Sequence, residues 1–375
     1  MSTGSLNRVE IDLAALRHNH SVIRSRLKPG VRVMAVVKAD AYGHGLVPVA
    51  RTLADCGVDT FAVAEVEEGI RLREAGVNGE IVVLVGAVPE FFAEMVAHRL
   101  TPVLYDPAGL AALSALAVAA RTTVNVHLKV DVGMGRFGIM PEQAVAFARA
   151  LASLPGLALA GVLSHLPKAD GPGPETDRQL ARFEALLAEL GNGEAVPPQV
   201  SHIANSAGLF RTPAAHFDMV RPGITLYGCS PMAGGGADLD LRPVMRFASR
   251  VMQIKEVPAG YGISYGHTFV TKRSSRLAVL PVGYDHGYLR RLSNCGEVLI
   301  RGRRAPLCGN VCMSACVADI TELPEVATGD EVVLMGRQGE AVIDADEVAQ
   351  WLGTINYEVL CLFGNQNHRV YLGEF

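Results

Sequence analysis

The sequence predicts an α/β fold, with an N-terminal (β/α)8 barrel over residues 1–238 and a C-terminal mainly-β domain over residues 239–375. In the first part, apolar strand-like runs alternate with amphipathic helix-like runs, a pattern typical of a parallel sheet. Eight such strands in about 200 residues favour closure into a barrel. An open doubly wound sheet is the alternative, but no GxGxxG motif follows the first strand.

The chain begins with a short strand-like run at residues 8–13, and residues 1–12 are expected to pair with the second domain. Asp12 can then cap a helix that extends to Leu27. The predicted barrel strands are residues 31–37, 60–66, 80–86, 101–106, 123–131, 157–166, 199–206 and 218–228. The helix-like runs between them are residues 47–57, 67–76, 89–100, 109–123, 141–154, 176–191 and 208–216.

The alternation of strand-like and helix-like runs ends near residues 233–238, AGGGAD, which we predict to be a linker. The rest is mostly short strand-like runs with one helix-like segment at residues 344–353, which favours a β-rich domain. The strand-like runs are residues 249–257, 275–283, 296–302, 330–336 and 368–372.

Composition narrows the class of protein. The chain has 375 residues, of which 49% are hydrophobic, so a large core is possible. Its net charge of −4 does not indicate binding to nucleic acid or to an anionic membrane. The N-terminus is polar and no long apolar run follows, so the sequence predicts neither a signal peptide nor a membrane span. We therefore expect a cytoplasmic protein.

The seven cysteines are scattered and odd in number, as expected for reduced thiols. Cys308, Cys312 and Cys316 recur at every fourth residue, a spacing that suggests a metal site. No CxxC motif accompanies them and the local sequence is strand-like, so we interpret them as structural thiols and predict no metal.

Polar residues gather where the predicted barrel strands end, which is where barrels carry their chemistry. Lys38 ends the first strand, although a lone lysine there usually extends its charge into solvent and a lone histidine is usually structural. Because many such positions converge on one rim, we predict an active site. The other residues at this rim are Lys129, Asp131, Arg136, Ser164, His165, Asn205, Ser206, Arg221, Gly223 and Ile224.

The loops after the seventh and eighth strands offer a hydroxyl and backbone N–H groups beside glycines, in NSAG and RPGI. Phosphate sites in barrels form at this corner. A reactive lysine facing a phosphate site suggests pyridoxal 5′-phosphate (PLP), held as a Schiff base. A Schiff-base aldolase acting on a phosphorylated sugar is the competing chemistry.

The second domain carries polar and aromatic clusters of its own. They contain Tyr265 in AGYGISYG, Tyr284 in PVGYDHGY, Met313 in GNVCMSA and Tyr357 in INYEVLC. Buried tyrosines beside glycines can also be packing residues with a satisfied hydroxyl.

With these residues in place, VVKADAYGHG resembles the PLP-attachment motif of the alanine racemase family, the fold-type III amino-acid racemases. The likeness extends over essentially the whole chain through DVGMGRFG, NSAG, RPGITLYG, GISYG, PVGY and YE. It implies that Lys38 carries PLP and acts as one acid/base. It implies that Tyr265, reaching in from a second subunit, is the other base on the opposite face.

The resemblance also implies supporting roles in the barrel. Arg221 is expected to hydrogen-bond the pyridine nitrogen, and His165 to link Arg221 towards Tyr265. Arg136 is expected to contact the phenolic oxygen of the cofactor and the substrate carboxylate. Lys129 matches a family lysine that is carbamylated, whose anion would hold Arg136.

The remaining implied residues bind phosphate or line the entryway. Met313 from the partner subunit is expected at the substrate carboxylate and Tyr284 at the entryway, so the resemblance implies a head-to-tail homodimer with shared active sites. The expected PLP-binding residues are Lys38, Tyr42, Asn205, Ser206, Arg221, Gly223, Ile224 and Tyr357.

Some positions depart from the family pattern. Ser314 stands where the family usually has aspartate, Asn310 where it has arginine and His286 where it has aspartate. Asn356 replaces a proline, and Leu166-Pro167 replaces Phe-Ala. Most of these positions belong to the loops expected at the entryway, so they bear on substrate size rather than on the reaction.

Three hypotheses follow. The first is an alanine racemase that supplies D-alanine as a peptidoglycan precursor. The second is a racemase of broader specificity that accepts serine or larger side chains. The third is a PLP carrier without turnover, which would resemble the barrel alone. A PLP decarboxylase of the same fold is disfavoured by Arg221, because those enzymes resemble one another in placing an acidic residue at the ring nitrogen.

Overall fold

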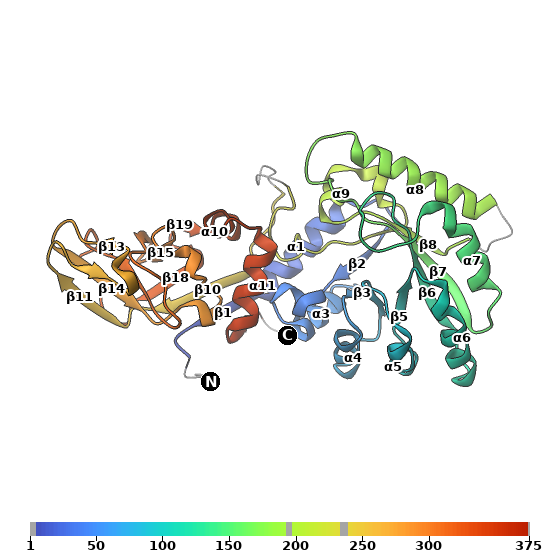
Figure 1. Ribbon diagram of the computed structural model, residues 1–375, viewed down its shortest axis with the longest axis horizontal. Coiled ribbons are helices and arrows are strands. Elements are labelled where there is room, and N and C mark those ends of the chain that lie inside the picture. Colours follow the sequence, from blue (N-terminus) through green and yellow to red (C-terminus); the bar gives the residue numbers. More distant parts are fainter. Residues whose placement is uncertain (1–4, 193–196, 233–238, 374–375) are drawn as a thin grey trace.

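The computed structural model describes residues 5–192, 197–232 and 239–373. The predicted linker at residues 233–238, and with it the boundary between the predicted domains, lies outside the described residues. Figure 1 shows two bodies side by side: a barrel wrapped in helices, and a smaller body made mainly of strands.

The barrel consists, in the described part of the chain, of an eight-stranded parallel sheet in the order β8-β7-β6-β5-β4-β3-β2-β9. Its two end strands meet: Asp218 N donates to Ser201 O at 3.2 Å, and Arg221 N donates to Ala204 O at 2.9 Å, which closes the ring. The strands are β2 (Arg32–Val36), β3 (Thr60–Val63), β4 (Glu80–Val83), β5 (Thr101–Leu104), β6 (Val124–Lys129), β7 (Leu157–Leu163), β8 (Val200–His202) and β9 (Met219–Val220). The predicted barrel is thus confirmed.

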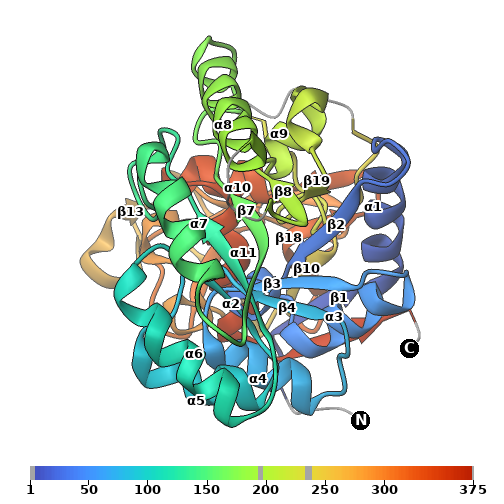
Figure 2. The same cartoon turned by 90° about the vertical axis from the view of Figure 1, so that its right-hand side faces the viewer.

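Helices surround this ring, as Figure 2 shows from the end of the barrel that faces away from the second body. The first begins as predicted, because Asp12 accepts hydrogen bonds from Ala14 N and Ala15 N, but it ends at Ser25 rather than Leu27. The helices are α1 (Leu13–Ser25), α3 (Leu46–Asp55), α4 (Val66–Glu74), α5 (Phe92–Ala97), α6 (Leu110–Ala119), α7 (Ala144–Ala152), α8 (Glu175–Asn192) and α9 (Ser206–Arg211).

The second body is mainly β, as predicted. Its larger sheet has the order β16-β15-β18-β10-β1-β20, with β19 paired to β18, and a smaller sheet has the order β11-β14-β17. Its strands are β10 (Met245–Arg250), β11 (Gln253–Val257), β12 (Gly262–Ile263), β13 (Phe269–Val270), β14 (Ser275–Leu280), β15 (Glu297–Ile300), β16 (Arg303–Pro306), β17 (Cys316–Asp319), β18 (Glu331–Gln338), β19 (Ala341–Ile343) and β20 (Arg369–Leu372).

Two sequence predictions for this body were wrong in detail. The run 249–257 is not one strand, because the chain leaves the larger sheet after β10 and enters the smaller one at β11. Beside the expected helix α10 (Ala345–Leu352) there is a second helix, α11 (Asn356–Gln366). Its Tyr, Val and Phe residues favour strands, so local propensity did not indicate it.

Helix α11 packs directly on the turn that follows Lys38. A Cβ atom at Gly364 would lie 2.0 Å from Gly43 O, and one at Gly43 would lie 2.6 Å from Leu360 O. This approach therefore requires glycine on both sides. It brings the second body against the predicted active-site strand of the barrel.

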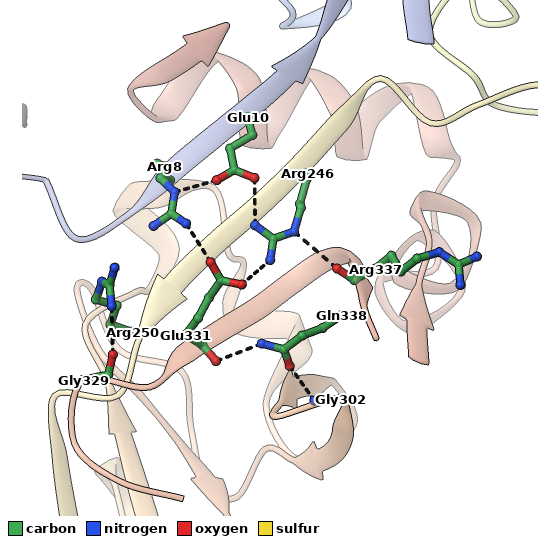
Figure 3. Close-up of polar contacts among 9 residues, drawn as sticks. All are labelled: Arg8, Glu10, Arg246, Arg250, Gly302, Gly329, Glu331, Arg337 and Gln338. Atoms are coloured by element: carbon green, nitrogen blue, oxygen red, sulfur yellow. Dashed lines mark hydrogen bonds and ion pairs between the residues drawn. The ribbon is translucent and has the colours of Figure 1, made fainter. Parts of the chain in front are cut away.

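Strand β1 (Arg8–Asp12) joins the sheet of the second body rather than the barrel. It pairs antiparallel with β10 and parallel with β20. Four charged side chains close a ring over β1, β10 and β18, drawn in Figure 3: Arg8 and Arg246 each contact both Glu10 and Glu331. The ring ties the first strand of the chain to two strands that come much later in the sequence.

The described residues contain no helix long and apolar enough to cross a bilayer. Nor do they contain a group of three histidine, cysteine or acidic side chains arranged to hold a metal. All seven cysteines lie within the described ranges and none forms a disulfide.

The ion-pair ring predicts an acid-sensitive share of stability. Burial acts to raise the pKa of Glu331, but Arg246 and Arg8 outweigh it and hold that pKa below its ordinary value of 4.5. The ring therefore stabilises the fold above about pH 4.5, and its contribution is lost as the pH falls through the depressed value. Glu331→Gln should lower the free energy of unfolding by about 1 kcal/mol near neutrality.

Urea unfolding at neutral and acid pH measures this effect. The variant should lose less stability than the wild type on acidification. Glu340→Gln, at an exposed position, is the control and should behave as wild type. Equal acid losses in wild type and Glu331→Gln would contradict the prediction.

Candidate active site

A cavity of about 390 Å³ lies at the carboxyl ends of the barrel strands. Most of the barrel residues expected there line it, and α11 adds two more. The lining comprises Val36, Lys38, Ala39, Tyr42, Leu84, Val85, Lys129, Arg136, Phe137, His165, Asn205, Ser206, Arg221, Gly223, Ile224, Tyr357 and Cys361.

Lys38 enters the cavity from the first residue of α2 (Lys38–Tyr42), a single turn in the left-handed region. Ala39, Asp40 and Ala41 have φ of 56°, 53° and 55°, a conformation that costs about 1–2 kcal/mol per residue. Asp40 stabilises the turn by accepting hydrogen bonds from Leu46 N at 2.9 Å and from the Arg369 guanidinium. Strand β20 thus helps to aim Lys38.

Charge and burial make Lys38 a weaker base than an exposed lysine. Burial, followed by the positive charge of Arg136, lowers the pKa of Lys38, and Glu68 opposes them. A larger fraction of its amine is therefore neutral, and able to take a proton, near neutral pH.

Arg221 lies buried at the end of β9, where its guanidinium is anchored on both sides. Nη1 donates to His202 Nδ1 and to His202 O, both at 2.9 Å, while Nη2 donates to Ser164 O at 2.6 Å. Nη2 also lies 3.3 Å from Nδ1 of His165. Among the described residues, no acceptor bonds to the Nε–H, so one donor of a fixed cation is available beside the cavity.

The glycine-rich turn after β6 positions Arg136. Asp131 accepts hydrogen bonds from the backbone N–H groups of Gly133, Met134, Gly135 and Arg136 at 2.6–3.2 Å. Burial acts to raise the pKa of Asp131, but these bonds outweigh it and lower that pKa. The turn is therefore fixed by its own carboxylate, which leaves the Arg136 guanidinium exposed at the cavity.

Lys129 is buried at the end of β6 among cations. Burial, and then the charges of Arg221 and Arg136, lower the pKa of Lys129 to about 7. The same causes in the same order, burial and then Arg221, hold the pKa of His165 well below its usual range. A neutral His165 can accept from Arg221 at Nδ1 only if its proton is on Nε2.

The loops after β8 and β9 form a small polar cradle at the opposite wall. Gly223 N donates to Ser206 Oγ at 2.9 Å, and Thr225 Oγ1 donates to the same atom at 3.1 Å. A Cβ at residue 223 would lie 2.5 Å from the Tyr42 hydroxyl. Asn205 caps α9 by accepting from Gly208 N at 3.0 Å, so it shapes the cradle.

These features fit PLP. The cradle offers the hydroxyl groups of Ser206 and Tyr42 and backbone N–H groups for a phosphate. Lys38 offers an amine for the aldehyde carbon, and the unused Nε–H of Arg221 offers a donor for the pyridine nitrogen.

The second-body residues expected at the site lie elsewhere in the described chain. Tyr265, Met313 and Tyr284 are 71%, 58% and 40% exposed and do not line this cavity. They lie on adjoining loops: Ser264 Oγ, next to Tyr265, donates to Asn310 O at 2.6 Å, and Asp285 N donates to Met313 O at 3.1 Å. The structure thus gathers them on one exposed face.

The departures from the family pattern belong largely to this face. Asn310 Nδ2 donates to Tyr265 O at 2.6 Å, and Ser314 Oγ donates to Asp285 Oδ2 at 2.7 Å. His286 Nδ1 lies 2.6 Å from the other oxygen of Asp285. The acidic side chains expected at positions 286 and 314 are absent, but the carboxylate of Asp285 contacts both His286 and Ser314. Asn356 lies apart, bonded to Asp346 at 2.6 Å.

Sequence reasoning missed several lining residues, notably Cys361. Tyr357 and Cys361 are four residues apart, so they share one face of a helix. The signal was present in the spacing, but it required recognition of α11. Leu84, Val85 and Phe137 carry no chemistry and had no signal of their own.

Comparison with known proteins agrees with this geometry. The models "Alanine racemase, N-terminal domain" and "Alanine racemase, C-terminal domain" match residues 11–231 and 244–371. The curated alanine racemase of Syntrophobacter fumaroxidans is 47% identical over 367 residues, 96% of this chain and 96% of that protein. The solved alanine racemase of Clostridium difficile 630 has a TM-score of 0.93 at 34% identity and covers 99% of this chain and 97% of its own. That from Bacillus anthracis with bound L-Ala-P has 0.90 at 34% identity, covering 98% and 95%.

The close approach at Gly223 gives a direct test of the cradle. Gly223→Ala should weaken PLP binding at least about tenfold, because the new methyl group would displace the Tyr42 hydroxyl. Absorbance titration of the apoprotein with PLP measures it. Gly191→Ala in α8, where a Cβ meets no atom within 4 Å, is the matched control and should bind as wild type. Equal affinities for both variants would place the phosphate elsewhere.

Proposed function

The chain belongs to the alanine racemase family, and we propose that it interconverts L-alanine and D-alanine with Lys38 and Tyr265 of the partner subunit as its two acid/base groups. Its cofactor is PLP. The observation that carries the proposal is one cavity that joins a lysine of depressed pKa, a buried arginine with an unused N–H and a hydroxyl-rich cradle.

Within this proposal the chain's own residues bind and orient the cofactor. Ser206, Tyr42 and Tyr357, with Asn205 and the N–H groups of Gly223 and Ile224, would hold the phosphate. Arg221 would donate to the ring nitrogen, and because it is a cation it would disfavour protonation there. When bound, PLP supplies an electron sink for the electron pair left on Cα after the α-proton is removed.

Racemisation needs one group to remove the α-proton and another to return it from the opposite face. Lys38 Nζ serves one face. Since Tyr265 lies exposed and outside its own chain's cavity, we assign the other face to the hydroxyl of Tyr265 of the partner subunit. Arg136 and Met313 of the partner subunit are assigned to the substrate carboxylate, and Tyr284 to the entryway.

A head-to-tail homodimer is the assembly this assignment needs. It is supported by two exposed faces: the second-body loops with Tyr265 and Met313, and the barrel rim, where the apolar side chains of Val85, Val88 and Phe91 are exposed beside the cavity. Apolar surface of this kind is typical of interfaces. We also propose a cytoplasmic location, supported by seven cysteines that form no disulfide.

The position of Asp285 supports the assignment of alanine over the hypothesis of broader specificity. The expected loss of an acidic group near the entryway motivated the broader-specificity hypothesis, but the carboxylate of Asp285 lies bonded to Ser314 between the two altered positions. Turnover of L-alanine, L-serine and L-lysine by purified protein distinguishes the hypotheses. A preference for serine or lysine would replace the alanine assignment.

The two-base assignment predicts that one variant loses the PLP chromophore and the other loses turnover alone. Lys38→Ala should abolish the borohydride-reducible yellow chromophore formed with PLP. Tyr265→Phe should retain the chromophore but lower racemisation by about 10²-fold or more in both directions, since the equilibrium between the enantiomers is fixed. Exchange of the α-proton with solvent should then persist from the enantiomer whose proton faces Lys38 and be lost from the other. Equal loss of exchange from both enantiomers would argue against Tyr265 as the base on one face.

Mixing the two inactive variants tests the shared site. A heterodimer of Lys38→Ala and Tyr265→Phe chains holds one site in which wild-type Lys38 faces wild-type Tyr265 of the partner subunit. Activity should therefore return after the mixed dimers are dissociated and reassociated. Each variant treated alone is the control. No recovery despite exchange of subunits would place Tyr265 outside the partner's site.

The depressed pKa of Lys129 predicts a carbamate. Below about pH 7 this amine is mostly protonated, and above it the neutral amine can add to CO2 and release a proton. The resulting anion would lie among Arg136 and Arg221. Incubation with ¹³C-bicarbonate should give a carbamate NMR signal that strengthens from acid to alkaline pH and is missing in Lys129→Ala. The same signal in the variant would assign it to another amine.

A further inference from the structure

A line of buried polar side chains runs from the cavity through the interior of the barrel. Arg221 Nη1 lies 2.9 Å from His202 Nδ1, and His202 Nε2 lies 3.0 Å from His127 Nδ1. His127 Nε2 lies 3.5 Å from Glu80 Oε1, long for a hydrogen bond, and bonds to no other acceptor in the described chain. Both rings are fully buried.

This line connects the two ends of the barrel. Arg221 follows β9 at the carboxyl ends of the strands, whereas Glu80 is the first residue of β4 at their amino ends. There Glu80 and His127 line a second cavity, of about 380 Å³. A Cβ at Gly161 of β7 would lie 2.6 Å from His127 Nδ1, so the ring has room only beside a glycine.

The donor at one end of the line and the acceptor at the other together orient the protons between them. A guanidinium only donates, so His202 Nδ1 must accept and the proton of a neutral His202 must be on Nε2. That proton points at His127 Nδ1, which must accept in turn, so His127 carries its proton on Nε2, towards Glu80. A proton on His127 Nδ1 would oppose the His202 proton, so the arrangement favours His127 with a proton on Nε2 alone.

The groups around the line agree with this direction. Burial, followed by the charge of Arg221, holds the pKa of His202 well below its usual range, so the ring is neutral. Burial acts to raise the pKa of Glu80, but His127, Thr101 and Arg32 outweigh it and lower that pKa. A cation that only donates at one end and a carboxylate that only accepts at the other require the same orientation.

We propose that Glu80 and His127 are positioning residues for the cofactor: they set the tautomer of His202 and so hold the Arg221 guanidinium with its Nε–H facing the cavity. The inference rests on the proposed contact of Arg221 with the PLP ring nitrogen. Glu80 adds an acceptor at the far end and so reinforces the direction that Arg221 sets. Without it the Nε2–H of His127 has no acceptor, and the competing arrangement, with the His127 proton on Nδ1, gains weight. In that arrangement the His202 proton moves to Nδ1 and opposes an Arg221 N–H, which weakens the contact that orients the guanidinium.

The tautomers are directly measurable on the full-length apoprotein. Long-range ¹H–¹⁵N correlation spectra of protein labelled with ¹⁵N-histidine should show both rings protonated at Nε2 and not at Nδ1. His127→Gln and His202→Gln assign the signals. A doubly protonated His127, or a proton on Nδ1 of either ring, would overturn the proposal without any variant of Glu80 and without reference to activity.

Two Glu80 variants then separate the acceptor from the side chain's packing. Glu80→Gln keeps an accepting oxygen and should keep both tautomers and the wild-type affinity for PLP. Glu80→Met should change the His127 tautomer and weaken PLP binding by about tenfold. Thr101→Val removes only the hydroxyl that donates to Glu80 at 3.2 Å and is the matched control, with unchanged tautomers.

The outcomes distinguish this inference from the proposed function. Equal behaviour of Glu80→Gln and Glu80→Met, or unchanged tautomers in Glu80→Met, would overturn the positioning role and leave the racemase assignment intact. Failure of the wild type to bind PLP would overturn both. Circular dichroism of each variant confirms that a weaker affinity does not reflect unfolding.

Discussion

The buried cation of Arg221 is the constraint on which the site depends. Burial lowers the pKa of Arg221 to about 10, so it stays charged at neutral pH and must be satisfied in place. Backbone oxygens of Ser164, His202 and Ile203 satisfy it, and these come from the ends of neighbouring strands. Its own backbone N–H, bonded to Ala204 O, helps to close the barrel. One residue therefore couples closure of the sheet to the direction of the donor in the cavity.

The same positive charge adds to the effect of burial on its neighbours. Lys129 and His165 are buried beside a cation that cannot leave, so burial first and the charge of Arg221 second lower the pKa of each and favour its neutral form. Lys38 is affected more by burial and by Arg136. The depressed basicity of the site is thus a property of the arrangement of strand ends rather than of any single residue.

Sequence periodicity was enough to predict the barrel, since each strand and helix carries its own apolar pattern. It also indicated Lys38, Lys129 and Arg221, because polar residues that end apolar strands are conspicuous. It did not indicate Glu80, His127 and His202 as one line, since they belong to three strands and meet only when the ring closes. Helix α11 was missed for a different reason: its residues have mixed propensity, and packing against Gly43 decides its conformation.

Strand β1 has a consequence for synthesis on the ribosome. It is made first, yet its sheet partners β10 and β20 are made only after the whole barrel sequence. At about 5–20 residues per second, this strand waits for roughly 10–50 s with both edges unpaired. Arg8 and Glu10 place opposite charges along it during that interval, and charged edges discourage pairing with other chains. The charges that later pair this strand with β10 and β18 thus begin as protection for a nascent strand.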